Sequence, residues 1–299
     1  MLSPLWRLNC GTVDVRGTHL RTSFKAAFGG ALLGAGGLAY YAREIEPADV
    51  EVVSVSLVLP RLAREFDGYR IAQIGDLHAD GWMTPGRLLG LVNLVNAEEP
   101  ELVAITGDFT TYSRLRSLIR HVPGIAAPLR RLRVPDGAFA VLGNHDHRTD
   151  AGVVRRALGA GGVTELGNAV QTLHRDGATL HLCGVDDVHE DMDGLDRVLE
   201  NLPEKGAAIL LAHEPDFADK SAATASFDLQ LSGHSHGGQT GLPLVRRLLL
   251  PKLSRKYPSG LYKVDGMPLY TNRGLGAHPR FRFLCRPEIT ILTLRSPES

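Results

Sequence analysis

IAQIGD, residues 71–76, is an apolar run that ends in a carboxylate, and His78 follows two residues later. Runs of this kind, with apolar residues first and polar residues at the end, recur along the chain. We interpret each as a buried β-strand that presents polar residues at its carboxyl end. The further runs are ELVAITGD at 101–108, GAFAVLGNHD at 137–146, TLHLCGVDD at 179–187, AAILLAHEPD at 207–216 and DLQLSGHSH at 228–236.

Segments with helical spacing lie between several of these strands. RLLGLVNLVNAEE at 87–99 ends before Pro100, a basic stretch covers about 114–133, and VVRRALGA lies at 153–160. The β-branched residues 50–59 predict one more strand, and the last forty residues predict antiparallel strands separated by turns. Strands that alternate with helices predict an α/β fold in which helices cover buried sheets.

The carboxyl ends of the strands are where sites form in open α/β sheets. Singly, each polar residue there has an ordinary explanation as a helix cap, a turn or a structural histidine. Buried together without partners, such groups would each cost about 1–3 kcal/mol, and metal coordination removes that cost. We therefore predict a metal site there. The candidate residues are Asp76, His78, Asp108, Asn144, His145, His213, His234 and His236.

Seven of these side chains, all except His145, provide four contacts to each of two ions if one carboxylate bridges them. Two ions about 3.5–4 Å apart can activate water and hold the attacking and leaving oxygens of a phosphate ester. The imidazole-rich set favours Mn, Fe or Zn over Mg and Ca. The three cysteines lack Cys-x-x-Cys spacing, so His, Asp, Glu or Asn must hold any metal.

The ordered blocks GDLH, GD, GNHD, His213 and GHSH, within residues 75–237, resemble those of the calcineurin-like metallophosphoesterases. The resemblance implies a four-layer αββα sandwich and hydrolysis by a metal-bridged hydroxide. It also implies that His145 stabilises or protonates the leaving oxygen, with Asp146 orienting it. One ion would take Asp76, His78, Asp108 and His236, and the other Asp108, Asn144, His213 and His234.

A longer match, including GYRIAQIGDLH, GHSHGGQ and RPEITILTL, resembles a bacterial branch with membrane-associated enzymes that hydrolyse UDP-2,3-diacylglucosamine. We therefore expect a phosphodiester or pyrophosphate bond in a lipid-linked or cell-envelope substrate. The alternative is a nucleotide or cyclic-nucleotide phosphodiesterase, or a nuclease. Lys and Arg balance Asp and Glu at 33 each, so no nucleic acid partner is expected. A non-enzymatic binding module would have lost candidate ligands.

Candidate substrate contacts lie near the carboxyl terminus. The cationic apolar segment LVRRLLLPKLSRKYP, residues 244–258, contains Arg246 and Arg247 and suits an anionic lipid or a membrane surface. The alternative is a solvated helix pair broken by Pro251. Arg273 suits a substrate phosphate or an ion pair that pins the last strands. Asp186 and Asp187 lie near the site or form a plain turn.

The amino-terminal residues form a separate segment in our interpretation, with 1–49 preceding a catalytic domain at 50–299. Residues 26–42 carry no charge, with basic residues before and acidic residues after, which resembles an export signal or signal anchor. This pattern predicts membrane association with the body outside the cytoplasm. The alternatives are the cytoplasmic face of the inner membrane, or a Gly/Ala-rich helix packed on the body. Residues 1–15 are predicted to form no folded element.

Overall fold

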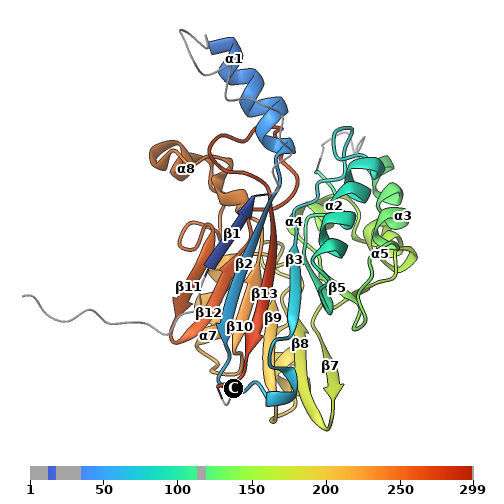
Figure 1. Cartoon of the computed structure of the whole chain (residues 1–299), viewed down its shortest axis with the longest axis vertical. Coiled ribbons are helices and arrows are strands. Elements are labelled where there is room, and N and C mark those ends of the chain that lie inside the picture. Colours follow the sequence, from blue (N-terminus) through green and yellow to red (C-terminus); the bar gives the residue numbers. More distant parts are fainter. Residues whose placement is uncertain (1–12, 18–34, 113–118, 298–299) are drawn as a thin grey trace, which may run out of the picture.

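Two β-sheets pack face to face, and helices cover both outer faces (Figure 1). The computed structural model describes residues 13–17, 35–112 and 119–297. This arrangement is the four-layer αββα sandwich that the family resemblance implies. The central parallel strands of both sheets deliver their carboxyl ends to one edge, where the candidate residues lie.

The first sheet has seven strands in the order β1-β2-β13-β3-β4-β5-β6. Strands β3 to β6 run parallel, as expected for strands joined by helices. Strand β13 is antiparallel to β3 but parallel to β2, so the prediction that the last strands are all antiparallel is wrong at β13. The bounds are β1 Val13–Gly17, β2 Glu51–Val58, β3 Arg70–Ile74, β4 Leu102–Thr106, β5 Ala138–Val141, β6 Val163–Glu165 and β13 Glu288–Arg295.

The second sheet has six strands in the order β11-β12-β10-β9-β8-β7. Its centre is parallel, and each edge is an antiparallel hairpin, β7 with β8 and β11 with β12. Strands β6 and β7 have no counterpart among the predicted runs. The bounds are β7 Ala169–Arg175, β8 Ala178–Gly184, β9 Ala207–Leu211, β10 Leu229–Ser232, β11 Gly260–Val264 and β12 Met267–Thr271.

The helices lie on the outer faces and at the site end of the sandwich (Figure 1). Helices α2, α3 and α5 contribute side chains to the core outside the first sheet, and α6 and α7 to the core outside the second. The bounds are α1 Ala35–Tyr40, α2 Pro85–Ala97, α3 Ala126–Leu129, α4 Asn144–Thr149, α5 Ala151–Ala160, α6 Leu195–Asn201, α7 Ala218–Ala222 and α8 Pro243–Leu249.

Alternation along the strands builds three separate apolar cores. In β4, Leu102 and Ala104 enter the core between the sheets, whereas Val103 and Ile105 face the helices. In β9, Ile209 likewise faces the other sheet. Side chains two residues apart share a face of a strand, so a strand buried on both faces supplies two cores. This double burial explains why these strands are continuous apolar runs.

Two predicted helical regions are shorter in the structure. Of the stretch 114–133, residues 113–118 lie outside the described part, and a 3₁₀ segment at Ile119–Ile125 precedes α3. Of the helix pair that was the alternative interpretation of 244–258, only α8 forms, and the chain after Leu250 continues without helix. Pro251 removes a backbone donor at that point and prevents the helix from continuing.

The amino-terminal segment differs in part from its prediction. Residues 13–17 form β1, which pairs with β2, so the expectation of no folded element before residue 15 is wrong there. Residues 26–34 of the predicted signal or anchor segment 26–42 lie outside the described residues. Among the residues that are described, no helix combines the length and apolar character that a membrane span requires.

Candidate metal centre

The candidate ligands gather at the carboxyl ends of β3, β4, β9 and β10 and at the start of α4. Most of them sit in the left-handed backbone region, which residues other than glycine rarely adopt. Such conformations cost about 1–3 kcal/mol each and concentrate at functional sites. The strain indicates that the bends aim side chains at a common point. The positive φ angles are 49° at Asp76, 48° at His78, 54° at Asp108, 66° at His234 and 49° at His236.

The first cluster brings together Asp76, His78 and His236, and all three are buried. His78 Nε2 lies 2.9 Å from His236 Nε2, and the latter lies 3.5 Å from Asp76 Oδ1. Two ring nitrogens this close repel each other unless a proton or a cation lies between them. Ligand atoms about 2.1 Å from one ion are separated by roughly 3 Å, so the spacing fits a shared cation.

The second cluster brings together Asp108, His213 and His234, again all buried. His213 Nε2 lies 3.1 Å from His234 Nδ1 and 3.3 Å from Asp108 Oδ2. The same Asp108 oxygen lies 3.7 Å from His78 Nε2 in the first cluster. A single carboxylate oxygen therefore faces both clusters. This is the position that a bridging ligand needs.

Backbone carbonyls select the ring nitrogen that each histidine offers. His78 Nδ1 lies 3.2 Å from the Thr110 carbonyl, and His213 Nδ1 lies 2.6 Å from the Thr106 carbonyl. His234 Nε2 lies 2.8 Å from the Lys252 carbonyl. A ring nitrogen beside a carbonyl carries the proton, which leaves the other nitrogen with a free lone pair. His78 and His213 therefore present Nε2 to their clusters, and His234 presents Nδ1.

Burial keeps two of these imidazoles neutral. It lowers the pKa of His78 to about 3, and His145 acts in the same direction. It also lowers the pKa of His234 to about 3, with His213 adding to the effect. Burial raises the pKa of Asp76 to about 7 even though His213 opposes the change. Neutral imidazoles are ready to bind a cation, and a cation beside Asp76 would favour its ionised form.

Two glycines allow the strand ends to approach the clusters. A Cβ atom on Gly143 would collide with Asp108 Oδ1 and lie 2.7 Å from His213 Nε2. A Cβ atom on Gly233 would lie 2.6 Å from Asp76 Oδ2. Any other residue would displace the candidate ligands, so these glycines are required by space at the centre.

The start of α4 supplies the remaining candidates. Asn144 is buried, and its Oδ1 atom has no hydrogen-bond partner among the described residues, an orphan that a cation would satisfy. The Tyr112 backbone N–H donates to His145 Nδ1 over 2.8 Å. The proton of neutral His145 therefore sits on Nε2. His145 lines the pocket over the clusters, so it can serve as a proton donor there.

The family resemblance implies that Asp146 orients His145. In the structure Asp146 is buried, and its two oxygens accept from other groups instead. Its Oδ1 accepts from the Thr110 backbone N–H and its Oδ2 from the Gly143 backbone N–H, each at a distance of 3.0 Å. The carboxylate thus ties the loop after β4 to the loop before α4. It positions the segments that carry Asp108 and His145.

A pocket of about 220 Å³ opens over both clusters. The residues in its wall that were not predicted from the sequence include Arg148, His189 and His278. Arg148 follows Asn144 by one helical turn, a spacing that could have revealed it. The His278 ring centre lies 6.0 Å from that of His145, but no local pattern predicts this approach, because the loop before β13 brings it in from a distant part of the chain.

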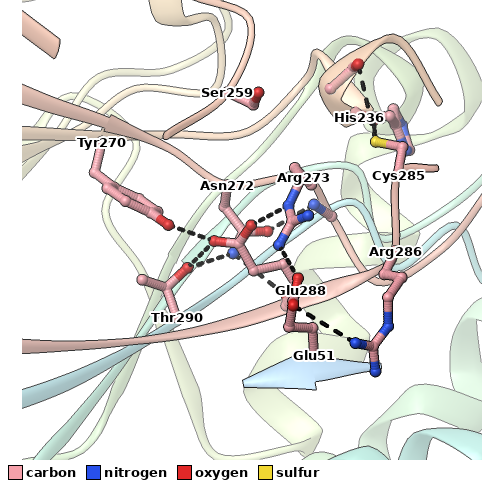
Figure 2. A network of polar contacts seen from close by, with 12 residues as sticks. Glu51, His236, Ser259, Tyr270, Asn272, Arg273, Cys285, Arg286, Glu288 and Thr290 are labelled. Atoms are coloured by element: carbon pink, nitrogen blue, oxygen red, sulfur yellow. Dashed lines mark hydrogen bonds and ion pairs between the residues drawn. The ribbon is translucent and has the colours of Figure 1, made fainter. Parts of the chain in front are cut away.

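Arg273 lies away from that pocket wall, in an ion-pair network (Figure 2). Its Nη2 lies 2.6 Å from Glu51 Oε2, and its Nε donates to Glu288. Glu288 also accepts from the Tyr270 hydroxyl over 2.7 Å. Of the two roles considered for Arg273, the structure favours the one in which it pins the last strands. Carboxylates engage its Nε and Nη2 atoms, so the structure gives the substrate-phosphate role no support.

The other uncertain candidates also lie outside the pocket wall. Arg246 Nη2 donates to Ser259 Oγ over 2.6 Å, and Arg247 is exposed on α8. His147 Nε2 lies 2.7 Å from Asp186 Oδ1, and Asp187 Oδ1 accepts from the Glu190 backbone N–H. Asp187 therefore forms a turn and Asp186 an ion pair.

The fold and the paired clusters define a metal-dependent phosphoric ester hydrolase. The chain belongs to the calcineurin-like phosphoesterase family, whose model matches residues 69–238. Members of this family use two divalent metal ions, and the Asp/His clusters fit that requirement.

Three relatives resemble the chain over most of its length. The uncharacterized metallophosphoesterase YkuE of Bacillus subtilis is 34% identical, over 94% of this chain and 98% of that protein. Phosphodiesterase YaeI of Escherichia coli is 27% identical, over 76% of this chain and 82% of that protein. UDP-2,3-diacylglucosamine pyrophosphatase LpxG of Chlamydia trachomatis is 27% identical, over 84% of this chain and 91% of that protein.

Proposed function

We propose that this protein hydrolyses a phosphodiester or pyrophosphate bond with the help of two divalent ions, and that Asp108 would be a ligand to both. The observation that carries the proposal is the position of Asp108 Oδ2, 3.7 Å from His78 Nε2 and 3.3 Å from His213 Nε2. The assigned ligands are Asp76, His78, Asp108 and His236 for one ion, and Asp108, Asn144, His213 and His234 for the other. When bound, the ions supply an activated water and a clamp for the phosphate oxygens.

The side chains around the clusters then have distinct tasks. His145 gives the proton on Nε2 to the leaving oxygen, and its Nδ1 contact with the Tyr112 N–H holds the required tautomer. Arg148 contacts a phosphate oxygen from the pocket wall. Its Nε donates to Glu190 Oε1 over 2.7 Å, which fixes the direction of the guanidinium. Asp146 keeps the loops in register.

The proposed substrate is lipid-linked, such as UDP-2,3-diacylglucosamine, the compound in the name of the chlamydial relative. The pocket of about 220 Å³ has room for a phosphate group but none for acyl chains, which must lie outside it. We further propose that residues 50–299 form the catalytic domain, that residues 1–49 associate it with a membrane, and that the body lies outside the cytoplasm.

Product analysis with Mn-loaded protein and UDP-2,3-diacylglucosamine tests the proposal. Wild type should release UMP and the lipid monophosphate, and His145→Ala should release far less. Bis-p-nitrophenyl phosphate is assayed in parallel as a soluble diester. Cleavage of the diester without cleavage of the lipid would refute the lipid substrate and keep the dinuclear hydrolase. Failure of metal-loaded protein on both compounds would contradict the proposed reaction.

A further inference from the structure

Helix α8 buries none of its own side chains, although it is rich in leucine. Leu244 and Leu248 stand one helical turn apart on one face, and each is 84% exposed. A short helix in water normally gains its stability by packing an apolar face on the body. The opposite arrangement here leaves the apolar face of α8 pointing outward.

The exposed surface continues beyond these two leucines. Gly241 N donates to the Phe283 carbonyl over 2.8 Å, which joins the start of α8 to the loop that carries Leu284. Soluble proteins rarely leave a contiguous apolar surface of this kind without a partner. We name it the α8 surface; its members, each at least 36% exposed, are Leu242, Leu244, Val245, Leu248, Leu249, Leu253 and Leu284.

The chain segment that carries most of the α8 surface has charge of one sign. Residues 237–264 contain six Lys or Arg residues and no Asp or Glu. Arg247, Lys252 and Arg255 are exposed and form no ion pair with any described carboxylate. Apolar side chains flanked by unpaired cations match the boundary of a bilayer with anionic headgroups, where both kinds of group are satisfied together.

The α8 surface adjoins the pocket. Leu249 and Pro251 belong to the pocket wall together with His234 and His236. The Lys252 carbonyl also accepts from His234 Nε2 over 2.8 Å, so the chain just after α8 touches the metal centre directly. A bilayer that covered the leucines would therefore meet the pocket at the depth of its headgroups.

The end of the amino-terminal segment reaches the same end of the molecule. Figure 1 shows α1 and α8 at one end of the long axis. Arg282 N donates to the Ala42 carbonyl over 2.8 Å, and the Glu46 carboxylate accepts from the Leu284 backbone N–H over 2.9 Å. Tyr40 on α1 is exposed like the leucines of α8. Ala42 and Glu46, at and just after the end of the charge-free segment, thus contact the loop that carries part of the α8 surface.

We propose that the α8 surface docks on an anionic lipid bilayer and holds the pocket against the lipid headgroups. The leucines enter the acyl boundary, and Arg247, Lys252 and Arg255 meet the headgroup phosphates. Docking itself does not depend on catalysis. Only the delivery of a lipid-linked phosphate to the ions rests on the function proposed above.

Flotation of the full-length chain with vesicles tests the docking. Vesicles of phosphatidylcholine mixed with phosphatidylglycerol are compared with phosphatidylcholine alone. Leu244→Ser combined with Leu248→Ser should lower affinity for the anionic vesicles by about tenfold or more. The matched control is Leu89→Ser combined with Met192→Ser, two exposed apolar residues far from α8 in the sequence, and it should bind like wild type. Neither pair should change hydrolysis of bis-p-nitrophenyl phosphate.

A second measurement separates α8 from the amino-terminal segment. In Leu248→Trp, lipids brominated in the acyl chain should quench additional fluorescence, whereas Leu89→Trp should add none. Unchanged vesicle affinity in the α8 variant, or no quenching at position 248, would overturn the proposal. If the double-serine variant of α8 lost self-association but kept vesicle binding, the surface would instead be assigned to a second copy of the chain. Docking with no cleavage of the lipid substrate would refute only the proposed substrate.

Discussion

Asp108 directs one carboxylate oxygen toward both histidine clusters. Its Oδ1 accepts from the His145 backbone N–H over 2.9 Å, which leaves Oδ2 directed at the clusters. His213 and His145 hold the pKa of Asp108 well below its usual range despite burial, which alone would raise it. The residue is therefore ionised and fixed before any cation arrives, which lowers the cost of organising the centre.

Asp108→Asn should reduce bound metal from about two ions per chain to one or fewer, because a neutral amide bridges two cations poorly. We expect kcat/KM to fall by at least roughly 10²–10³-fold. Metal analysis by mass spectrometry and steady-state kinetics on bis-p-nitrophenyl phosphate measure both effects. Asp196→Asn, an exposed aspartate of α6, is the control. Full metal content in Asp108→Asn would disprove the bridging assignment.

His145→Ala should lower kcat by about 10²–10³-fold for a diester with an alkyl leaving group. The loss should be much smaller for a p-nitrophenolate leaving group, which departs without a proton. Metal content should stay at the wild-type level, because His145 is not an assigned ligand. Comparison of kcat for the two diesters measures the difference. Equal losses on both would show that His145 acts on binding or on metal retention.

Strands β2, β12 and β13 meet at the Arg273 network, which joins elements of both sheets. Glu51 belongs to β2, Tyr270 to β12 and Glu288 to β13 (Figure 2). Glu288 is buried and accepts hydrogen bonds from Tyr270 and Thr290, so its charge needs the guanidinium nearby. The network thus holds the end of one sheet against the other just behind the metal centre.

Arg273→Met should lower the free energy of unfolding by about 3 kcal/mol, because it leaves the buried Glu288 without a cation and leaves Glu51 with only its longer contact to Arg286. KM for a soluble diester should stay close to the wild-type value, because the side chain lies away from the pocket. Urea unfolding and steady-state kinetics check the two expectations. Arg286→Met, at the more exposed edge of the network, should cost less. A raised KM with unchanged stability would restore the substrate role.

At the scale of the whole molecule, the site lies where the two sheets and several loops converge. His147 in α4 follows β5 of the first sheet, and Asp186 follows β8 of the second sheet. Their 2.7 Å contact therefore links the two sheets. Arg155 of α5 reaches the other oxygen of Asp186 over 3.1 Å. The hydrogen bond to Asp186 raises the pKa of His147, and the pKa of Asp186 is lowered although burial opposes it.

His147→Gln should therefore destabilise the protein in a limited pH range. The raised pKa of His147 stabilises the fold fully below its unfolded value of about 6.5, and the effect disappears as pH rises through the folded value. The lowered pKa of Asp186 stabilises above its unfolded value of about 3.9, and the effect disappears as pH falls through the folded value.

The difference in unfolding free energy between wild type and His147→Gln should be largest between about pH 4 and 6.5, at roughly 1–2 kcal/mol. It should shrink toward alkaline pH. Urea unfolding across this range measures it, and a difference that is independent of pH would exclude the ion pair.

Much of the architecture was predictable, because the central strands are buried on both faces and therefore appear as continuous apolar runs. Strands β6 and β7 were missed because β6 is very short and β7 is only half-buried, so neither leaves a long apolar run. The direction of β13 was also missed, because local sequence does not say which neighbour a strand will join.

Local sequence was sufficient for the α/β class and for the order of the candidate ligands, because each ligand follows a strand and parallel strands bring their carboxyl ends to one edge. The four-layer αββα arrangement was implied by the family resemblance. Long-range packing decided the rest. Asp146 and Arg273 bond to partners on other segments, and His278 reaches the pocket from a distant loop. The outward face of α8 depends on what the body leaves uncovered. No local pattern encodes these contacts, since each depends on where a remote part of the chain comes to lie.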